Sequence, residues 1–417
     1  MLLTMKCRIC SNKNLEKFLS LGESPLANNF LKKEDLEKGE PKFPLELVFC
    51  STCNLVQLSY VVDPELMFKN YVYVSSTSNT FRHHFTKMAE DITKDFHLDE
   101  KSLAVDIGSN DGTLLKGFQK FNIKVMGVEP ATNVARIAEE KGVETINNFF
   151  NKESVDKIID KKGKADVLIA CNVFAHIDNI DSVIENVKLL LKDSGIFVIE
   201  VQYLVNTIEY MTFDNIYHEH LSYYSLTTLK YFFEKHDMEI FNSIKVKTHG
   251  GSLRVFIQKK NNEHKINENV NKILDYEKKI GINNMGIHKG FAEKVYSVKE
   301  KLNSYIKNIK KEKRIIAGYG APAKSSTLLN FCSIGKKEID YIVDDNPLKI
   351  GLYTPGTHIP VVSSEELEKN TPDYILILAW NFTHEILEKT KKYADKGVKF
   401  IIPLPEPRIV EGILNDQ

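Results

Sequence analysis

The order of apolar and polar positions divides the 417-residue chain into regions of different character. Short apolar runs bounded by turn residues are typical of buried strands. The strands predicted from such runs are 102–107, 125–128, 165–170 and 195–201 in one series, and 314–317, 339–343, 374–378 and 399–402 in another. Helical periodicity separates the runs, so each series predicts a mostly parallel sheet with helices on both faces.

A lysine- and asparagine-rich segment, residues 261–313, lies between the two series. Its apolar positions recur at alternating spacings of four and three, at Phe291, Val295, Val298, Leu302, Tyr305 and Ile309. This stripe predicts a long helix packed against its own protein. A dimerising coiled coil is the less favoured alternative, because fewer than three full heptads are present. We therefore expect a monomer or a weak dimer.

Residues 1–70 are turn-rich and contain too few apolar side chains for an independent core. Two Cys-x-x-Cys pairs, Cys7 with Cys10 and Cys50 with Cys53, lie in this region. In a cytoplasmic chain such pairs favour metal binding over disulfides, and four thiolates complete the tetrahedral shell of a structural zinc ion. Ligation would also supply folding free energy that the apolar residues do not. Four unligated thiols are the alternative.

Composition narrows the classes of function. The 56 basic and 56 acidic side chains cancel, so nothing draws the chain generally toward nucleic acid or an anionic membrane. No apolar run approaches the roughly 20 residues that span a bilayer, and the first residues lack a secretory signal. The expectation is a cytoplasmic protein with a small-molecule ligand and no nucleic-acid or membrane partner.

A glycine turn, from Asp106 to Gly112, follows the first strand of the first series and opens a helix. Its G-x-x-x-G spacing differs from the G-x-G-x-x-G of dinucleotide sites. Acidic side chains would repel a pyrophosphate but suit the cationic sulfonium of S-adenosylmethionine, whose ribose Glu129 would bind from the end of the next strand. The turn resembles the donor site of class I methyltransferases. The predicted donor contacts are Asp106, Gly108, Asn110, Gly112, Glu129 and Asn172. A glycine turn of another doubly wound fold is the alternative.

Two histidine-containing segments carry the candidate acid–base chemistry. His176 follows the strand 165–170, and residues 217–220 read Tyr-His-Glu-His. A solvated loop has no need of two imidazoles, a phenol and a carboxylate in succession, whereas a proton-transfer site has. If the segment is extended, at most half of the set faces one substrate. A second metal site is the weaker alternative, because His218 and His220 have no evident third ligand.

Taken together, the motifs resemble the nucleotide-sugar C-methyltransferases, which act on thymidine-diphosphate-linked keto-deoxysugars. The motifs are Cys7-x-x-Cys10, Leu21-Gly22-x-x-Pro25-Leu26-Ala27-Asn28, Tyr71-x-Tyr73-x-Ser75-Ser76, the glycine turn, Ala175-His176, Tyr217-His218-Glu219-His220, Gly250-Gly251-Ser252-Leu253-Arg254 and Gly318-Tyr319-Gly320-Ala321-x-Ala323-Lys324. They span nearly the whole chain. The resemblance implies an α/β protein with a zinc-binding module (1–70), a class I Rossmann-like methyltransferase domain (71–260), a helical bridge (261–313) and a second Rossmann-like domain that binds the sugar nucleotide (314–417).

The same resemblance implies roles for single residues. His220 would remove the proton next to the ketone, Tyr217 and Tyr73 would orient the substrate or stabilise the enolate, Glu219 would fix an imidazole or bind the sugar, and His176 would contact the substrate. The implied substrate contacts are His218, Ser252, Arg254 and Lys324. The sugar would lie between the central and C-terminal domains.

The second glycine turn, Gly318-x-Gly320-x-x-Ala323, would by itself indicate a nicotinamide cofactor. However, Pro322 removes a backbone N–H that a pyrophosphate could use, and no group for hydride transfer is evident. The resemblance makes this lobe the nucleotide-sugar site, although Ser325-Ser326 stand where relatives often have Gly-Asn, which leaves the nucleotide open. A sugar O-methyltransferase and an NAD-dependent oxidoreductase that uses Gly318 are the alternative functions.

Overall fold

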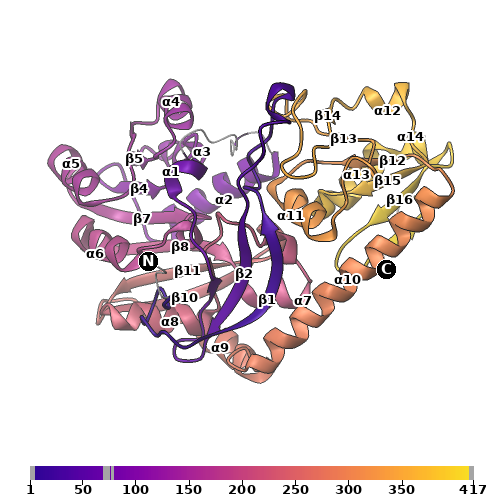
Figure 1. The fold of residues 1–417 in the computed structure, drawn as a ribbon. Helices are drawn as coiled ribbons and strands as arrows, with labels where there is room; N and C mark the ends of the chain where they lie inside the picture. The colour runs from indigo at the N-terminus through magenta and orange to yellow at the C-terminus, as the bar shows by residue number, and fades with distance from the viewer. Residues whose placement is uncertain (1–4, 69–75, 77–78, 413–417) are drawn as a thin grey trace.

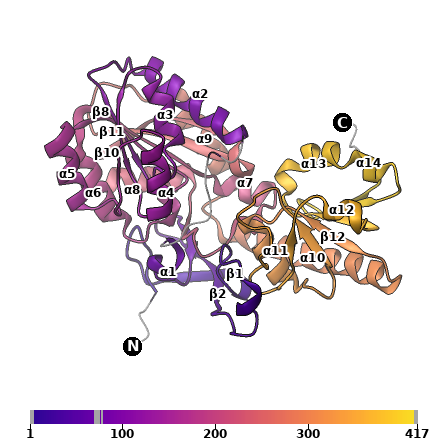
Figure 2. The same cartoon turned by 90° about the horizontal axis from the view of Figure 1, so that it is seen from above.

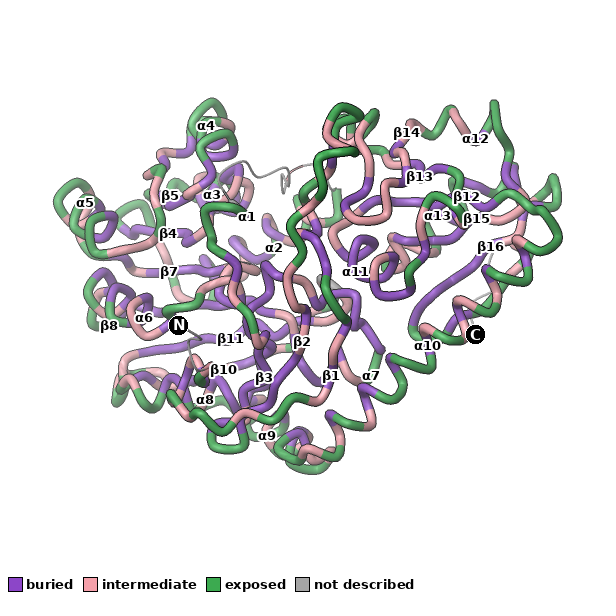
Figure 3. The backbone as a smooth tube through the Cα atoms, in the orientation of Figure 1, coloured by how far each residue is buried: buried purple, intermediate pink, exposed green. Residues whose placement is uncertain are grey.

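The computed structural model describes residues 5–68, 76 and 79–412, whose strands form three sheets. Figures 1 and 2 show a central lobe and a C-terminal lobe side by side, with the N-terminal strands between them. In Figure 3 the strands of the two α/β lobes are buried along most of their length, and exposed positions concentrate on the outer helices and loops. None of the helices in the described ranges is both long enough and apolar enough to cross a membrane.

The N-terminal sheet is antiparallel and has the order β1-β2-β3-β9. Its strands are β1 Leu15–Ser24, β2 Phe43–Cys50, β3 Val56–Leu58 and β9 Ser222–Tyr223. The expectation of a merely turn-rich region missed the long β1–β2 hairpin, in which Leu45, Leu47 and Phe49 alternate inward. The buried side chains of this sheet belong to the same hydrophobic core as the central lobe, so the module borrows its core from its neighbour.

The central sheet has seven strands in the order β10-β11-β8-β7-β4-β5-β6. Its strands are β4 Leu103–Ile107, β5 Lys124–Val128, β6 Thr145–Ile146, β7 Ala165–Cys171, β8 Leu191–Gln202, β10 Met238–Val246 and β11 Ser252–Lys259. All four predicted strands are present and pair in parallel, whereas β10 and β11 form an antiparallel edge. The strand order reverses at β4, between β5 and β7, and ligands bind at such reversals.

Helices cover both faces of the central sheet. Side chains of α2 and α3 pack on one face, and those of α5, α6 and α8 on the other. Up to residue 280, the described part of the chain contains the helices α1 Pro64–Phe68, α2 Asn79–Asp95, α3 Thr113–Gln119, α4 Thr132–Glu140, α5 Lys152–Lys162, α6 Ile180–Leu190, α7 Leu204–Glu209, α8 Leu226–Lys235 and α9 Glu268–Ile280, with the 3-10 turns η1 Lys33–Asp35, η3 Phe174–His176, η4 Phe213–Asn215 and η5 Thr248–Gly250.

The C-terminal sheet has the order β14-β13-β12-β15-β16-β17 and is parallel except for β17. Its strands are β12 Ile316–Tyr319, β13 Tyr341–Val343, β14 Val361–Val362, β15 Tyr374–Ile377, β16 Lys399–Ile402 and β17 Arg408–Val410; its helices are α11 Ala323–Cys332, α12 Glu366–Lys369, α13 Thr383–Lys389 and α14 Lys391–Ala394, with the 3-10 turn η6 Trp380–Phe382. The first strand begins two residues later than predicted, because Arg314 pairs with Asp373 at the surface. The order again reverses at the first strand, β12.

The bridge contains one long helix, α10 Met285–Lys311, which runs from the N-terminal sheet to the C-terminal lobe (Figure 1). Five of the six predicted stripe residues are buried in it. The exception is Tyr305, which is only partly buried, while Ile306 takes the inward position. The structure thus confirms the predicted helix and its self-packing over most of the stripe.

His288, near the start of α10, gives the fold a pH dependence. Its side chain is 0% exposed, lies between the rings of Phe18 and Phe49, and its Nε2 bonds to the Ile282 carbonyl at 3.0 Å. Burial lowers the pKa of His288 from 6.5 to about 4. The unfolded chain therefore binds the proton first, so this contribution to stability is present above pH 6.5 and is lost as the pH falls toward 4.

We predict that stability falls by about 2 kcal/mol between pH 7.5 and 5 through this group. Urea unfolding at the two pH values measures the fall, and it should be smaller in His288→Phe. The exposed His384 offers a matched control, since His384→Phe should retain the wild-type pH dependence. An equal fall in all three proteins would contradict the assignment to His288.

Candidate active site

A cavity of about 1150 Å³ lies between the central and C-terminal lobes. Its walls include the carboxyl ends of β4, β5, β7 and β8, the segment from Tyr217 to His220, and the start of α11. The N-terminal module contributes Asn28 and Pro64. A cavity of roughly 300–1,000 Å³ holds one small ligand, so this one has room for a methyl donor and an acceptor together.

The glycine turn after β4 contains three residues with left-handed backbone, Gly108, Asn110 and Gly112. Gly108 has φ +68°, and a Cβ there would lie 2.7 Å from Val173 Cγ2. Gly112 has φ +74°, and its Cβ would lie 2.9 Å from the Val143 side chain. Gly108 lines the cavity, whereas Gly112 begins α3 behind the wall. The turn therefore brings backbone close to the ligand at Gly108 and allows close internal packing at Gly112.

Glu129 closes the donor side of the cavity from the end of β5. Its Oε2 accepts the backbone N–H of Asn110 at 2.9 Å, and its Oε1 accepts that of Ala131 at 2.8 Å. These bonds hold the carboxylate at the wall, where it is 6% exposed, and burial raises its pKa. A fixed carboxylate of this kind suits a pair of ribose hydroxyls.

Two further predicted donor contacts contain oxygens without a hydrogen-bond partner in the described part of the chain. Asn172, with φ +56°, lines the cavity, and its Oδ1 is one of them. Asp106 lies directly behind the wall and is 3% exposed; burial, together with the charge of Glu129, raises the pKa of its carboxyl. A buried acceptor is costly to leave unpaired, so Asn172 Oδ1 at the cavity wall favours a ligand with N–H donors.

The Tyr217 to His220 segment faces the same cavity. The segment is a turn, closed by the His220 N–H donating to the Tyr217 carbonyl at 2.9 Å. The turn brings Tyr217 and His220 together at the cavity, with ring centroids 4.0 Å apart. In an extended segment alternate residues would share a face; because the backbone turns here, Tyr217 and His220 line the cavity instead.

His220 is held in one tautomer. Its Nδ1 lies 2.6 Å from the Asn215 carbonyl, which can only accept, so Nδ1 carries the proton and the neutral ring has its lone pair on Nε2. The His176 ring stacks on it at 5.1 Å, and desolvation lowers the pKa of His176 to about 4. The neighbouring imidazole is therefore neutral at neutral pH and adds no positive charge beside the lone pair.

Glu219 and His218 point to other partners. Glu219 Oε1 accepts the Asn28 side-chain N–H at 2.6 Å, which ties the segment to the N-terminal module. His218 Nε2 lies 3.3 Å from the carbonyls of Phe43 and Pro44. Neither Glu219 nor His218 is among the described residues that line the cavity. Tyr73, the remaining predicted contact of this set, lies outside the described residues.

Ser252 and Arg254 lie on β11, and the structure gives them partners inside the central lobe. Arg254 donates twice to Glu200 Oε2, at 3.0 and 2.9 Å, and Ser252 Oγ donates to the Thr248 carbonyl. Glu200 is 0% exposed and also bonds to His84. Among the described residues the cavity lining includes neither Ser252 nor Arg254, so the structure supports a neutralising role for Arg254 and no substrate contact in this cavity.

Lys324 brings a positive charge to the opposite wall. It lies in the first turn of α11, lines the cavity and is 8% exposed. Its Nζ has no hydrogen-bond partner in the described ranges and lies 5.2 Å from the centre of the Trp380 ring. A buried ammonium with unused donors suits an anionic ligand.

The neighbouring Ser325 and Ser326 are buried and turn away from the cavity. Ser325 Oγ donates to the Pro322 carbonyl at 2.7 Å, and Ser326 Oγ donates to the Ala27 carbonyl of the N-terminal module at 2.8 Å. Ser325 therefore bonds within the start of α11, and Ser326 joins this helix to the N-terminal module.

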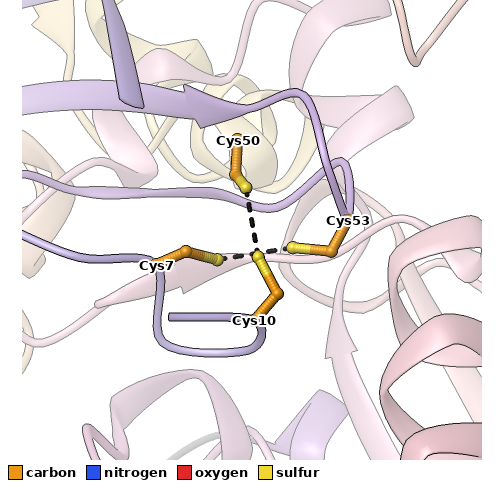
Figure 4. A group of neighbouring side chains, drawn as sticks. All are labelled: Cys7, Cys10, Cys50 and Cys53. Atoms are coloured by element: carbon orange, nitrogen blue, oxygen red, sulfur yellow. Dashed lines mark hydrogen bonds between the residues drawn. The ribbon is translucent and has the colours of Figure 1, made fainter. Parts of the chain in front are cut away.

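The four cysteines of the N-terminal module converge in space (Figure 4). Their sulfurs all lie within 4.8 Å of one another, with Cys7 to Cys53 at 3.3 Å and Cys10 to Cys50 at 3.5 Å. A zinc ion with 2.3 Å bonds to four sulfurs needs edges of about 3.8 Å, so the set fits zinc. The two pairs adopt the same turn, each followed by a left-handed residue, Ser11 or Asn54. All four positions are sulfur, which makes the site structural.

The fold and these two sites define a class of protein. A seven-stranded sheet with an antiparallel edge, a glycine turn at its reversal point and a carboxylate at the next strand end form the fold of a class I S-adenosylmethionine-dependent methyltransferase, here with a structural zinc site. Three family models match: "Putative zinc binding domain" at residues 7–68, "Methyltransferase domain" at 81–242 and "C-methyltransferase C-terminal domain" at 247–405.

C-methyltransferase NovU of Streptomyces niveus is 36% identical over 407 residues, which cover 98% of this chain and 97% of that protein. The chain therefore belongs to the C-methyltransferase family, as the sequence motifs predict.

The similar solved structures cover less than half of this chain. Magnesium protoporphyrin IX methyltransferase (ChlM) of Synechocystis PCC 6803 is 12% identical, covers 43% of this chain and 79% of its own, and has a TM-score of 0.33. The PH0226 protein of Pyrococcus horikoshii OT3 is 15% identical, covers 48% and 100%, and has a TM-score of 0.35. These similarities are too low to bear on the activity.

Glu129→Gln is predicted to weaken donor binding about 10- to 100-fold, since a charged acceptor contributes about 1.5–3 kcal/mol to its hydrogen bonds. Calorimetry with S-adenosylhomocysteine measures the change. Glu140→Gln provides a control, because Glu140 is an exposed residue of α4 paired with Arg136. Equal affinity in Glu129→Gln and wild type would show that this carboxylate does not hold the ribose.

Proposed function

We propose that the chain transfers the methyl group of S-adenosylmethionine to a carbon next to the ketone of a nucleotide-linked keto-deoxysugar. The observation that carries the proposal is the tautomer of His220, whose Nε2 lone pair belongs to a ring that lines the same cavity as Gly108 and Glu129. The C-methyltransferase relative, which matches nearly the full chain, supports transfer to carbon.

The first step of the proposed reaction is removal of a proton from the substrate. A carbon next to a ketone becomes nucleophilic only when its C–H bond is broken, so a base must accept that proton and a donor must stabilise the enolate oxygen. His220 Nε2 accepts the proton, and the Nδ1–H bond to Asn215 stabilises the imidazolium that forms. Tyr217, in ring contact with His220, is the candidate donor to the enolate oxygen.

Residues on two walls of the cavity hold the methyl donor and the sugar nucleotide. Gly108, Asn110, Glu129 and Asn172 bind the donor, which supplies an electrophilic methyl group and leaves as the neutral thioether with the electrons of the broken C–S bond. Lys324 contacts the phosphates of the sugar nucleotide from the C-terminal lobe. No covalent intermediate with the protein is needed.

The product of the reaction tests the proposal. Purified protein is incubated with S-adenosylmethionine labelled with ¹³C at the methyl group and with a thymidine-diphosphate-linked keto-deoxyhexose, and the product is examined by NMR. A labelled methyl group bonded to carbon is expected. A methyl group bonded to oxygen would replace the proposal with O-methylation, and a nicotinamide absorbance change without methylation would replace it with an oxidoreductase.

The proposed setting is the cytoplasm, with a small-molecule substrate and without a nucleic-acid or membrane partner. The balanced charge of 56 basic and 56 acidic side chains supports it, because neither polyanionic partner would be attracted generally.

A further inference from the structure

The segment that carries the Asn215 carbonyl is held by side chains of the C-terminal lobe. Trp380 Nε1 donates to Asp214 Oδ2 at 2.5 Å, and Thr327 Oγ1 donates to the Ile216 carbonyl at 2.9 Å. Between these two contacts, Asn215 accepts the Nδ1–H of His220. The atom that fixes the ring of the base thus lies on a segment, residues 213–216, that another lobe holds on both sides.

Lys324 belongs to the same group of contacts on the ligand side. It precedes Thr327 by three residues in α11, which places both on one side of the helix. Its ammonium lies over the Trp380 ring, and the negative charge of Asp214 acts on it. Helix α11 therefore offers an anion contact through Lys324, and through Thr327 it holds residues 213–216, whose Asn215 carbonyl fixes the ring of His220.

The segment has little room to move independently. Its side chains are fully or almost fully buried, with Phe213, Asp214 and Ile216 0% exposed. Close-packed surroundings transmit a displacement rather than absorb it. A shift of residues 213–216 would therefore move the Asn215 carbonyl and, with it, the ring of His220.

We propose that Trp380 and Thr327 are positioning residues that set the distance between the base His220 and the anionic group of the substrate at Lys324. This inference rests on the proposed function. Proton transfer needs the base within hydrogen-bond reach of the C–H group, and a misplacement of about 1 Å costs about 100-fold in rate. Neither residue is among the described residues that line the cavity, so both act through the segment they hold.

Two substitutions each remove one of these hydrogen bonds while keeping the shape. Trp380→Phe retains a ring over Lys324 but lacks the N–H, and Thr327→Val lacks the hydroxyl. The probe is a thymidine-diphosphate-linked keto-deoxyhexose, and the readouts are kcat, KM and deuterium incorporation from solvent at the carbon next to the ketone without methyl donor. Both variants should lower kcat and deuterium incorporation about 10- to 100-fold, with KM and the Kd for S-adenosylhomocysteine within about threefold of wild type.

Thr390→Val is the matched control. It removes an equally buried hydroxyl, which bonds to the Ile386 carbonyl within the C-terminal lobe at 2.6 Å. This variant should melt at a lower temperature but keep kcat and the rate of deuterium incorporation. If Trp380→Phe does not fold, Thr327→Val carries the test alone.

The positioning role is wrong if both variants keep the wild-type kcat, or if kcat, KM and donor affinity decline together with stability as in a general loss of structure. The His220→Gln variant distinguishes failure of the proposed function from failure of the positioning role. Wild-type turnover in His220→Gln would contradict the proposed function itself. A loss of turnover in His220→Gln, together with normal rates in Trp380→Phe and Thr327→Val, would contradict only the positioning role.

Discussion

His220→Gln should lower kcat by roughly 10²- to 10⁴-fold, the usual contribution of a general base. Glutamine retains a side-chain N–H that can donate to the Asn215 carbonyl, so the loop keeps a partner there, but it has no basic nitrogen at the Nε2 position. Turnover is measured with the keto-deoxyhexose nucleotide, and the first step separately by deuterium incorporation at the carbon next to the ketone. Donor affinity should not change, because Gly108 and Glu129, which follow β4 and β5, belong to other segments of the cavity wall.

His236→Gln is the appropriate control for this substitution. His236 lies at the end of α8, its Nε2 bonds to Asp181 at 2.7 Å, and its side chain is 13% exposed. Its loss should lower thermal stability without affecting either rate. A His220→Gln protein that exchanges deuterium as fast as wild type would exclude His220 as the base.

Cys50→Ser is the second substitution with a large expected effect. Wild type should contain one equivalent of zinc, and the variant should retain little, because structural zinc contributes an apparent 10–16 kcal/mol that depends on all four ligands. The module has no separate core to compensate, since its apolar residues pack into the core of the central lobe. Metal content by mass spectrometry and thermal unfolding measure the two effects.

Loss of zinc should also reduce turnover, although the metal lies away from the cavity. Asn28 of the module bonds to Glu219, and the Ala27 carbonyl accepts from Ser326 on α11. Cys332→Ser serves as the control, because Cys332 is buried in α11 and outside the four-sulfur set. A wild-type protein purified without zinc, yet fully folded, would disprove the structural role.

Local sequence patterns predicted most of the parallel strands. The runs that became β4, β5, β7 and β16 are short and apolar, and both faces of such strands are covered, so their pattern is independent of distant residues. The hairpin of β1 and β2 was missed because its polar and apolar residues alternate beside a long turn-rich loop. The antiparallel edge of β10 and β11 was missed because charged residues such as Arg254 interrupt it, and the partner that makes Arg254 acceptable, Glu200, lies 54 positions earlier.

The sequence named candidate site residues but not their arrangement in space. The motif at 217–220 identified His220 and Tyr217, yet only the turn explains why these two share the cavity. Asn28 was part of a motif but was given no role, and neither Asp214 nor Trp380 was given one, because the hydrogen-bond partner of each lies at least 166 positions away. Trp380 is the single tryptophan of the chain, which could have drawn attention to it, but composition alone does not show which residues it contacts.

The pairing of β9 with β3 restricts how such a chain can be divided or recombined. β9 begins two residues after His220, and its strand partner β3 belongs to the zinc module, so a fragment that starts at α2 would carry the loop at residues 217–220 next to an unpaired strand. Exchanging the zinc modules of two relatives would then succeed only where the incoming β3 presents the same hydrogen-bonding register to residues 222 and 223. The zinc module and the loop at residues 217–220 thus form one structural unit rather than two interchangeable parts.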